Sequence, residues 1–142
     1  MSSLEKTRKR VGPVAAMVFN NMDISFFISL QNLINYVLIC LENLPGASSL
    51  SNRFDELVQC AKEVECLLGR HIGVEPELHR LGEELVSEIR STVKSLKPLS
   101  DSGAQLDMDS ELLIISRSSS IQWAAVCLLE ELRRVLQSRK DS

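Results

Sequence analysis

The chain has 142 residues, of which 44% are hydrophobic and 25% charged, and its formal net charge is -3. This length and composition predict one globular domain with its own core and exclude a disordered chain. The negative net charge argues against a surface that binds nucleic acid throughout, so we expect protein partners and no nucleic acid. Leucine and glutamate abound while aromatic residues make up only 4% of the chain, which favours an all-α fold over a sheet.

Residues 1–12 are polar and basic, and we expect them to form a flexible tail. Its positive charges, a candidate basic patch for an anionic partner, are Lys6, Arg8, Lys9 and Arg10. No compact apolar segment with a small-residue cleavage site follows, so secretion is not expected. The four cysteines form no CxxC pair, which is typical of reduced thiols. Both observations favour an intracellular location, cytoplasmic or nuclear.

The first long helix is predicted over about 23–43. Pro13 could open a short helical stretch before it, which Asn20, Asn21 and Asp23 interrupt, and Asp23 is the expected N-cap. From Ile24 to Leu41 the helix is almost wholly apolar, yet serine and amide side chains gather on one side. Three interpretations stay open: a helix buried in its own bundle, a helix shared with a partner subunit, and, less favoured, a membrane span.

The next two helices are predicted over about 52–69 and 76–97. Asn52 is the expected N-cap of the first, and Pro76 suits the first turn of the second. The second should end near Lys97, because Pro98 disfavours helix in the residue before it. Each carries an apolar face at three- and four-residue steps, through Phe54, Leu57, Val58, Ala61, Val64 and Leu68 and through Leu78, Leu81, Leu85, Ile89, Val93 and Leu96.

The last helix is predicted over about 110–138, with Asp109 or Ser110 as its cap. Its apolar positions include Leu112, Ile115, Ile121, Ala125, Leu128, Leu132 and Val135. From Ile121 onward they follow the spacing of a coiled-coil seam. The serine-rich run 116–120 could kink or split the helix, and a short strand over 111–116 is a weaker alternative. Off the seam lie further apolar side chains, which indicates a second contact surface.

Four amphipathic helices with short connections predict an all-α four-helix bundle with an antiparallel, up-down-up-down path. We expect a single helical domain over 13–138 and a short tail over 139–142.

No catalytic, cofactor-binding or metal-binding residue is predicted. Cys60, Cys66, His71 and His79 lack the spacing of a zinc site, and the acids from Asp107 to Glu111 lack the glycine of a calcium loop. Arg117 precedes three hydroxyls that are candidate phosphorylation sites, Ser118, Ser119 and Ser120.

The sequence therefore favours a non-catalytic interaction module, a small subunit or adaptor of a larger intracellular complex, with one or more protein partners, a homo-oligomer being one option. Anchoring to a membrane through 24–41 is the alternative, and a small enzyme with an unrecognised site is the second alternative. The residues expected to contribute to core or interface are Phe26, Phe27, Ile34, Trp123, Val126 and Leu129.

Overall fold

The computed structural model describes residues 13–44, 49–71, 73–101 and 106–141, and within them the side chains of 24–44, 49–71, 73–100 and 106–139. This part of the chain holds four helices and no strand. They are α2 (Pro13–Glu42), α3 (Leu50–Arg70), α4 (Pro76–Asp101) and α5 (Met108–Asp141).

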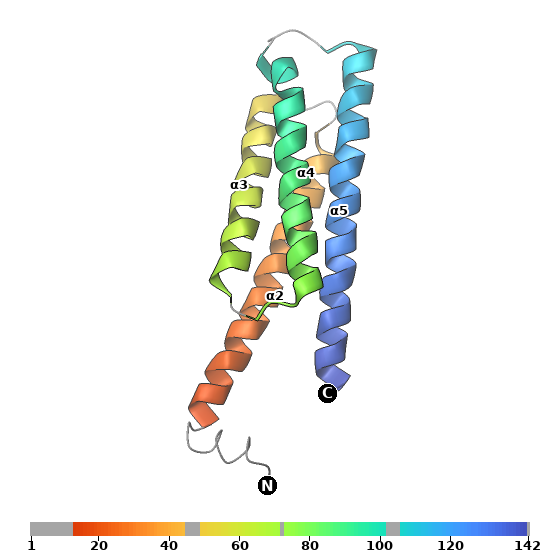
Figure 1. Cartoon of the computed structure of the whole chain (residues 1–142). Helices are drawn as coiled ribbons and strands as arrows, with labels where there is room; N and C mark the ends of the chain where they lie inside the picture. The colour runs from red at the N-terminus through yellow and green to blue at the C-terminus, as the bar shows by residue number, and fades with distance from the viewer. Residues whose placement is uncertain (1–12, 45–48, 72, 102–105, 142) are drawn as a thin grey trace.

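The helices form an antiparallel bundle in which each packs against two neighbours. α2 and α4 both contact α3 and α5, whereas the diagonal pairs do not pack on each other. Figure 1 shows α2 and α4 running one way and α3 and α5 the other, so the start of α2 and the end of α5 lie at the same end of the bundle. The predicted all-α, up-down-up-down bundle is confirmed.

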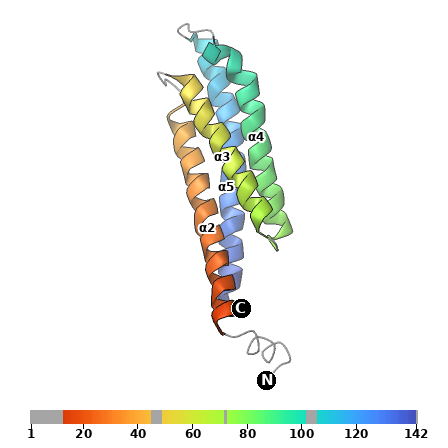
Figure 2. The same cartoon turned by 90° about the vertical axis from the view of Figure 1, so that its left-hand side faces the viewer.

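The helices are offset along the bundle axis. In two perpendicular views, the N-terminal part of α2 extends past the turn that joins α3 to α4 (Figures 1 and 2). At the opposite end, the first turns of α5 and the last turns of α4 extend past the end of α2. The first turns of α5 therefore lack α2 as a neighbour.

Helix α2 begins ten residues earlier than the sequence predicts. α2 starts at Pro13 and runs through Asn20, Asn21 and Asp23 without a break. Such residues lower helix stability by at most about 0.7 kcal/mol each, which is too little to break a helix that Pro13 opens well. Asp23 is thus an interior residue and not an N-cap.

The cap of α3 is Ser49. Its hydroxyl accepts a hydrogen bond from the backbone N–H of Asn52 at 3.4 Å, so Asn52 lies inside the first turn and is not the cap. Serine and asparagine are about equally good caps, and sequence offers no rule that chooses between them.

α4 continues beyond Lys97, through Pro98, to Asp101. Proline removes the backbone donor that would bond to the carbonyl of Lys94, so the helix continues with one hydrogen bond fewer. In the last turn, the hydroxyl of Ser100 donates to the carbonyl of Lys97 at 2.8 Å. The predicted stop at Lys97 is therefore wrong by one turn.

α5 is continuous through the serine run, so the split helix and the strand over 111–116 are both wrong. Ser119 donates to the carbonyl of Ile115 at 3.0 Å, which keeps its hydroxyl bonded within the helix. The cap is Asp107, whose Oδ1 accepts from the backbone N–H of Ser110 at 2.7 Å. Neither Asp109 nor Ser110 caps the helix.

The core face of α5 differs from the prediction in its first half. The buried seam runs at alternating four- and three-residue steps through Ile114, Ser118, Ile121, Ala125, Leu128, Leu132 and Val135. Leu112 and Ile115, predicted to face the core, are 56% and 47% exposed. Steps of three and four residues back from Ile121 lead to Ser118 and then to Ile114, which are both buried. Because Ser118 is polar, the apolar residues alone indicate the wrong face in this half of the helix.

Candidate interaction surface

The six residues predicted to form core or interface differ in how deeply they are buried. Phe26, Phe27 and Ile34 belong to the core, at 5%, 5% and 0% exposure. Leu129 is partly buried against that core, and Val126 is half-buried.

Trp123 is different, because 71% of it is exposed. A tryptophan that projects from a helix in this way leaves a large apolar area in water, and tryptophan is enriched at the centres of protein interfaces. It is the strongest candidate for a contact outside the bundle.

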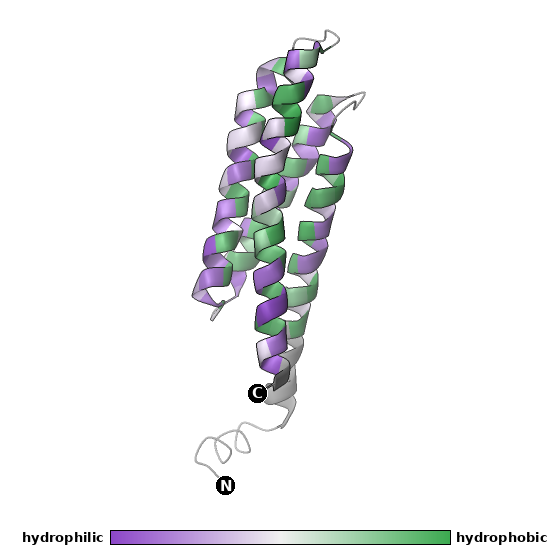
Figure 3. Cartoon of the chain, turned by 90° about the vertical axis from the view of Figure 1, so that its right-hand side faces the viewer, coloured by the Kyte–Doolittle hydropathy of each residue, from purple (hydrophilic) through white to green (hydrophobic). Residues whose placement is uncertain are grey.

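Trp123 belongs to a stripe of exposed apolar side chains on α5, on the side of the helix that faces away from the buried seam. With it lie Met108, Leu112 and Ile115, which are 75%, 56% and 47% exposed. We call these four residues the outer stripe. Figure 3 shows this side of α5, with apolar residues in the half near Met108 and polar residues toward the C-terminus.

From Leu112 onward the surface around the outer stripe carries little charge. Between Glu111 and Glu130 the only charged residue is Arg117, whereas Asp109 and Glu111 flank the beginning of the stripe. The positions beside the stripe are small or uncharged, such as Ser116, Ser119 and Gln122, and all three are exposed. A face of this kind is typical of the interior of an interface, where charged residues are depleted.

The outer side of α2 is also uncharged. Ile24, Ile28 and Ile39 are 55%, 53% and 54% exposed. Ser25, Gln31, Asn32 and Asn35 are exposed among them, so the polar side chains of this helix face solvent and not a partner helix in the bundle. Helix α2 is thus buried in its own chain on one side only.

Two segments are long and apolar enough to cross a membrane by length and composition alone. They are Ile24–Glu42, with mean hydropathy 1.8, and Met108–Arg139, with mean hydropathy 1.5. Helices that carry the core of a bundle have the same composition, and both segments contribute their inner sides to this core. Composition therefore does not distinguish the two environments.

The groove between α2 and α3 contains two buried thiols. Cys40 donates to Glu56 Oε2 at 3.5 Å, and Glu56 also pairs with Arg53 at 3.2 Å. Burial and the hydrogen bond to Glu56 raise the pKa of Cys40 to about 11, and burial and the nearby Cys40 raise the pKa of Cys60 to about 12. Both groups stay protonated at neutral pH, so neither is an activated nucleophile.

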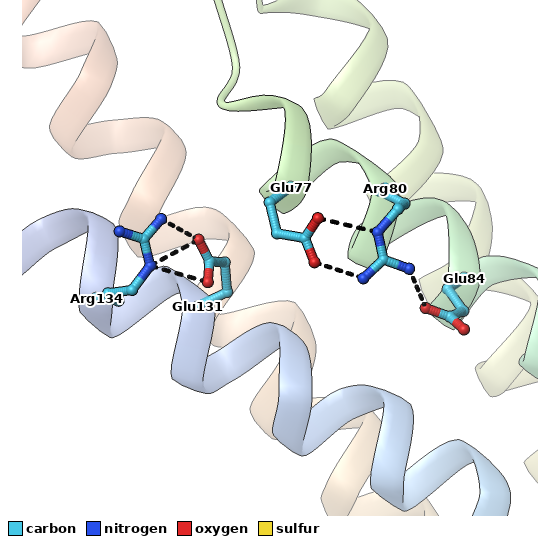
Figure 4. A network of polar contacts seen from close by, with 5 residues as sticks. All are labelled: Glu77, Arg80, Glu84, Glu131 and Arg134. Atoms are coloured by element: carbon cyan, nitrogen blue, oxygen red, sulfur yellow. Dashed lines mark hydrogen bonds and ion pairs between the residues drawn. The ribbon is translucent and has the colours of Figure 1, made fainter.

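The carboxylates near the α4–α5 contact are paired with arginines on the surface (Figure 4). Arg80 Nε lies 3.0 Å from Glu77 Oε2, and Arg80 Nη1 lies 3.2 Å from Glu84 Oε2. On α5, Glu131 pairs with Arg134. The hydrogen bond from Arg80 lowers the pKa of Glu77, which keeps that carboxylate charged rather than poised to transfer a proton.

The histidines lie apart in the bundle. His71 packs edge-on against Phe26, with ring centroids 4.8 Å apart, and His79 pairs with Glu83 at 3.3 Å. Among the described residues, no three side chains of histidine, cysteine, aspartate or glutamate gather as a metal ion requires.

The three candidate phosphorylation sites occupy different environments. Ser118 is 8% exposed, while Ser119 and Ser120 are exposed on the helix surface. The candidate basic patch, Lys6, Arg8, Lys9 and Arg10, lies outside the described residues.

The chain matches no protein-family model, no curated protein and no solved structure.

Proposed function

We propose that this protein is a non-catalytic helical interaction module, a small subunit or adaptor of an intracellular complex, and that it binds protein through the outer stripe of α5. The observation that carries the proposal is the 71% exposure of Trp123 within a stripe that also holds Met108 and Leu112. Isolated apolar residues are common on protein surfaces, whereas several of them along one side of a helix are typical of a binding site.

The energetics support the same proposal. Removing apolar surface from water gains about 25 cal/mol per Å², and tryptophan contributes more such area than any other side chain. The core does not use this area, because Ile121 and Ala125 on the opposite side of α5 complete the seam. The stripe is thus available to a partner without any rearrangement of the bundle.

The test is photo-crosslinking in cells, with a photoreactive phenylalanine analogue in place of Trp123. We expect adducts with protein from position 123, and none from the control position Ser95, which is exposed on α4. A Leu112→Glu substitution in the same chain should abolish the adducts, because it places a charge in the stripe. Equal labelling at positions 123 and 95 would contradict the proposal.

Membrane association is the second candidate, and the uncharged outer side of α2 supports it. Only 39% of the segment Ile24–Glu42 is buried within the bundle. Vesicle flotation tests this candidate: membrane binding predicts that the protein floats with vesicles and that Ile28→Lys reduces the floating fraction. A protein that stays at the bottom of the gradient with neutral and with anionic vesicles would exclude it.

A further inference from the structure

We infer that the outer stripe of α5 pairs with the same stripe of a second copy of this chain, in an antiparallel arrangement whose two-fold axis passes near Ile115. This inference rests on the proposed function, because it names the partner of the surface proposed there.

The spacing along the stripe is nearly symmetric about Ile115. Met108 lies seven residues before Ile115 and Trp123 lies eight after it. A two-fold axis just after Ile115, midway to Ser116, therefore sets Met108 of one copy beside Trp123 of the other. Methionine makes favourable sulfur–aromatic contacts with such a ring.

The other positions match large side chains with small ones. The same axis sets Leu112 of one copy against Ser119 of the other, while the two Ile115 side chains meet at the centre. Alternation of large and small side chains lets two helices approach closely, as in knobs-into-holes packing.

Charge is also compatible with self-pairing. When a surface pairs with the same surface of a second copy, a charged residue near the two-fold axis lies beside its own counterpart, and the two like charges repel each other. Arg117 lies on the far side of α5 from the stripe. Asp109 and Glu111 fall within the overlap, and the axis sets them against Gln122 and Ser120 of the other copy, so no two acidic residues face each other. Glu130 and Arg133 lie beyond the overlap, because the pairing uses only the first half of the helix.

The bundle leaves room for a second copy beside α5. The outer stripe faces away from the buried seam through which α5 packs against α2 and α4, so a partner helix can lie along it without displacing either. Because the two copies overlap only from about Met108 to Trp123, their bundles extend away from the axis in opposite directions and do not collide.

The area is sufficient for a modest dimer. From their exposed fractions, the four stripe residues present on the order of 500 Å² of surface per chain, and the surrounding serines and Gln122 add a polar rim. Standard interfaces bury about 800 Å² per partner, so we expect a reversible dimer rather than an obligate one.

Cysteine crosslinking tests the register. In a Cys66→Ser, Cys127→Ser background, a mixture of the Met108→Cys and Trp123→Cys variants should form a disulfide-linked dimer under mild oxidation. Either variant alone should not, because its two copies lie roughly 21–24 Å apart along the helix axis. Ile115→Cys should link to itself. Crosslinking of Trp123→Cys alone, with none in the mixture, would overturn the antiparallel register.

Sedimentation equilibrium tests the surface itself. Ile115→Lys should weaken dimerisation roughly a hundredfold, because two like charges would face each other across the axis. Ile28→Lys on α2 is the matched control, since it replaces an isoleucine of similar exposure (53% against 47%) and should leave the dimer intact. Equal weakening by both variants, or a wild-type protein that is monomeric throughout, would overturn the inference.

The crosslinking described for Trp123 separates this inference from the proposed function. Adducts with a different protein, in a chain that sediments as a monomer, would refute the second copy and retain the interaction module. The absence of any protein adduct would refute both.

Discussion

At the scale of single residues, Ser118 is the one polar side chain in the buried seam of α5. It is 8% exposed, and its hydroxyl has no hydrogen-bond partner. Leaving a buried donor or acceptor unsatisfied costs about 1–3 kcal/mol, so this position lowers the stability of the bundle. The same serine breaks the run of apolar residues, so the sequence does not show which residues of α5 form the seam.

We predict that Ser118→Ala raises the free energy of unfolding by about 1 kcal/mol, since it removes the unsatisfied hydroxyl and leaves the methylene packed. Ser119→Ala is the control, because both changes give the same gain in helix propensity while Ser119 is exposed. Urea denaturation followed by circular dichroism measures the difference. A larger gain from Ser119→Ala would contradict the packing described here.

The buried thiols give a second prediction at this scale. Below pH 9 the thiols of Cys40 and Cys60 are protonated in the folded and in the unfolded protein, so they contribute their full share to the free energy of unfolding. As the pH rises from 9 toward the folded pKa values of about 11 and about 12, the unfolded chain loses protons that the folded chain retains, and stability falls.

At pH 8 we therefore expect a disulfide reagent to modify the exposed Cys66 quickly, and Cys40 and Cys60 only after unfolding in urea. The release of thiol product measured with time, with Cys66→Ser as the control, identifies the fast group. Equal rates for all four cysteines in the native protein would be inconsistent with this core.

At the scale of elements, α2 shows why an apolar helix is hard to orient from sequence. Its isoleucines are chemically equivalent in the sequence, yet Ile34 is fully buried and Ile39 is 54% exposed. The serines and amides indicate which side is polar, and that side does face solvent. The interpretation as a helix buried within its own bundle is correct for one side of α2 and leaves the other open.

The same substitution should change the stability of the protein differently on the two sides of α2. Ile34→Ala should destabilise the protein by about 2–5 kcal/mol, because it opens a cavity in the core. Ile39→Ala should change stability by no more than about 0.5 kcal/mol. Thermal or urea unfolding of the two variants compares them directly, and similar losses for both would show that the outer side of α2 is covered in solution.

Helix ends were harder to predict than helix positions. Ser49 and Asp107 cap α3 and α5, although Asn52, Asp109 and Ser110 have equally suitable side chains. Several capping residues lie within one turn at each site, and local propensity differs among them by only tenths of a kcal/mol.

At the scale of the whole molecule, the position of the outer stripe on α5 determines the shape of the inferred dimer. Pairing through the first half of α5 makes the two bundles overlap there and extend from the axis in opposite directions. Each copy then extends from the axis near Ile115 to Asp141, so the two α5 helices together span roughly 80 Å.

Small-angle scattering of the dimer should therefore give an elongated particle, with a longest dimension of roughly 80 Å or more. Two bundles packed side by side over the full length of α5 would be shorter, at roughly 50 Å along the helices. The Ile115→Lys variant supplies the monomer curve for comparison. A compact dimer would contradict the antiparallel overlap.

The sequence by itself determined the all-α class, the number of helices and their antiparallel order. These features depend on local periodicity, turn residues and connection lengths, all of which are written along the chain. The tertiary structure alone decided which sides of α2 and α5 lie inside. Both helices are apolar around much of their circumference, so the side that is buried depends on where the neighbouring helices pack against them. The exposed position of Trp123 follows from that packing.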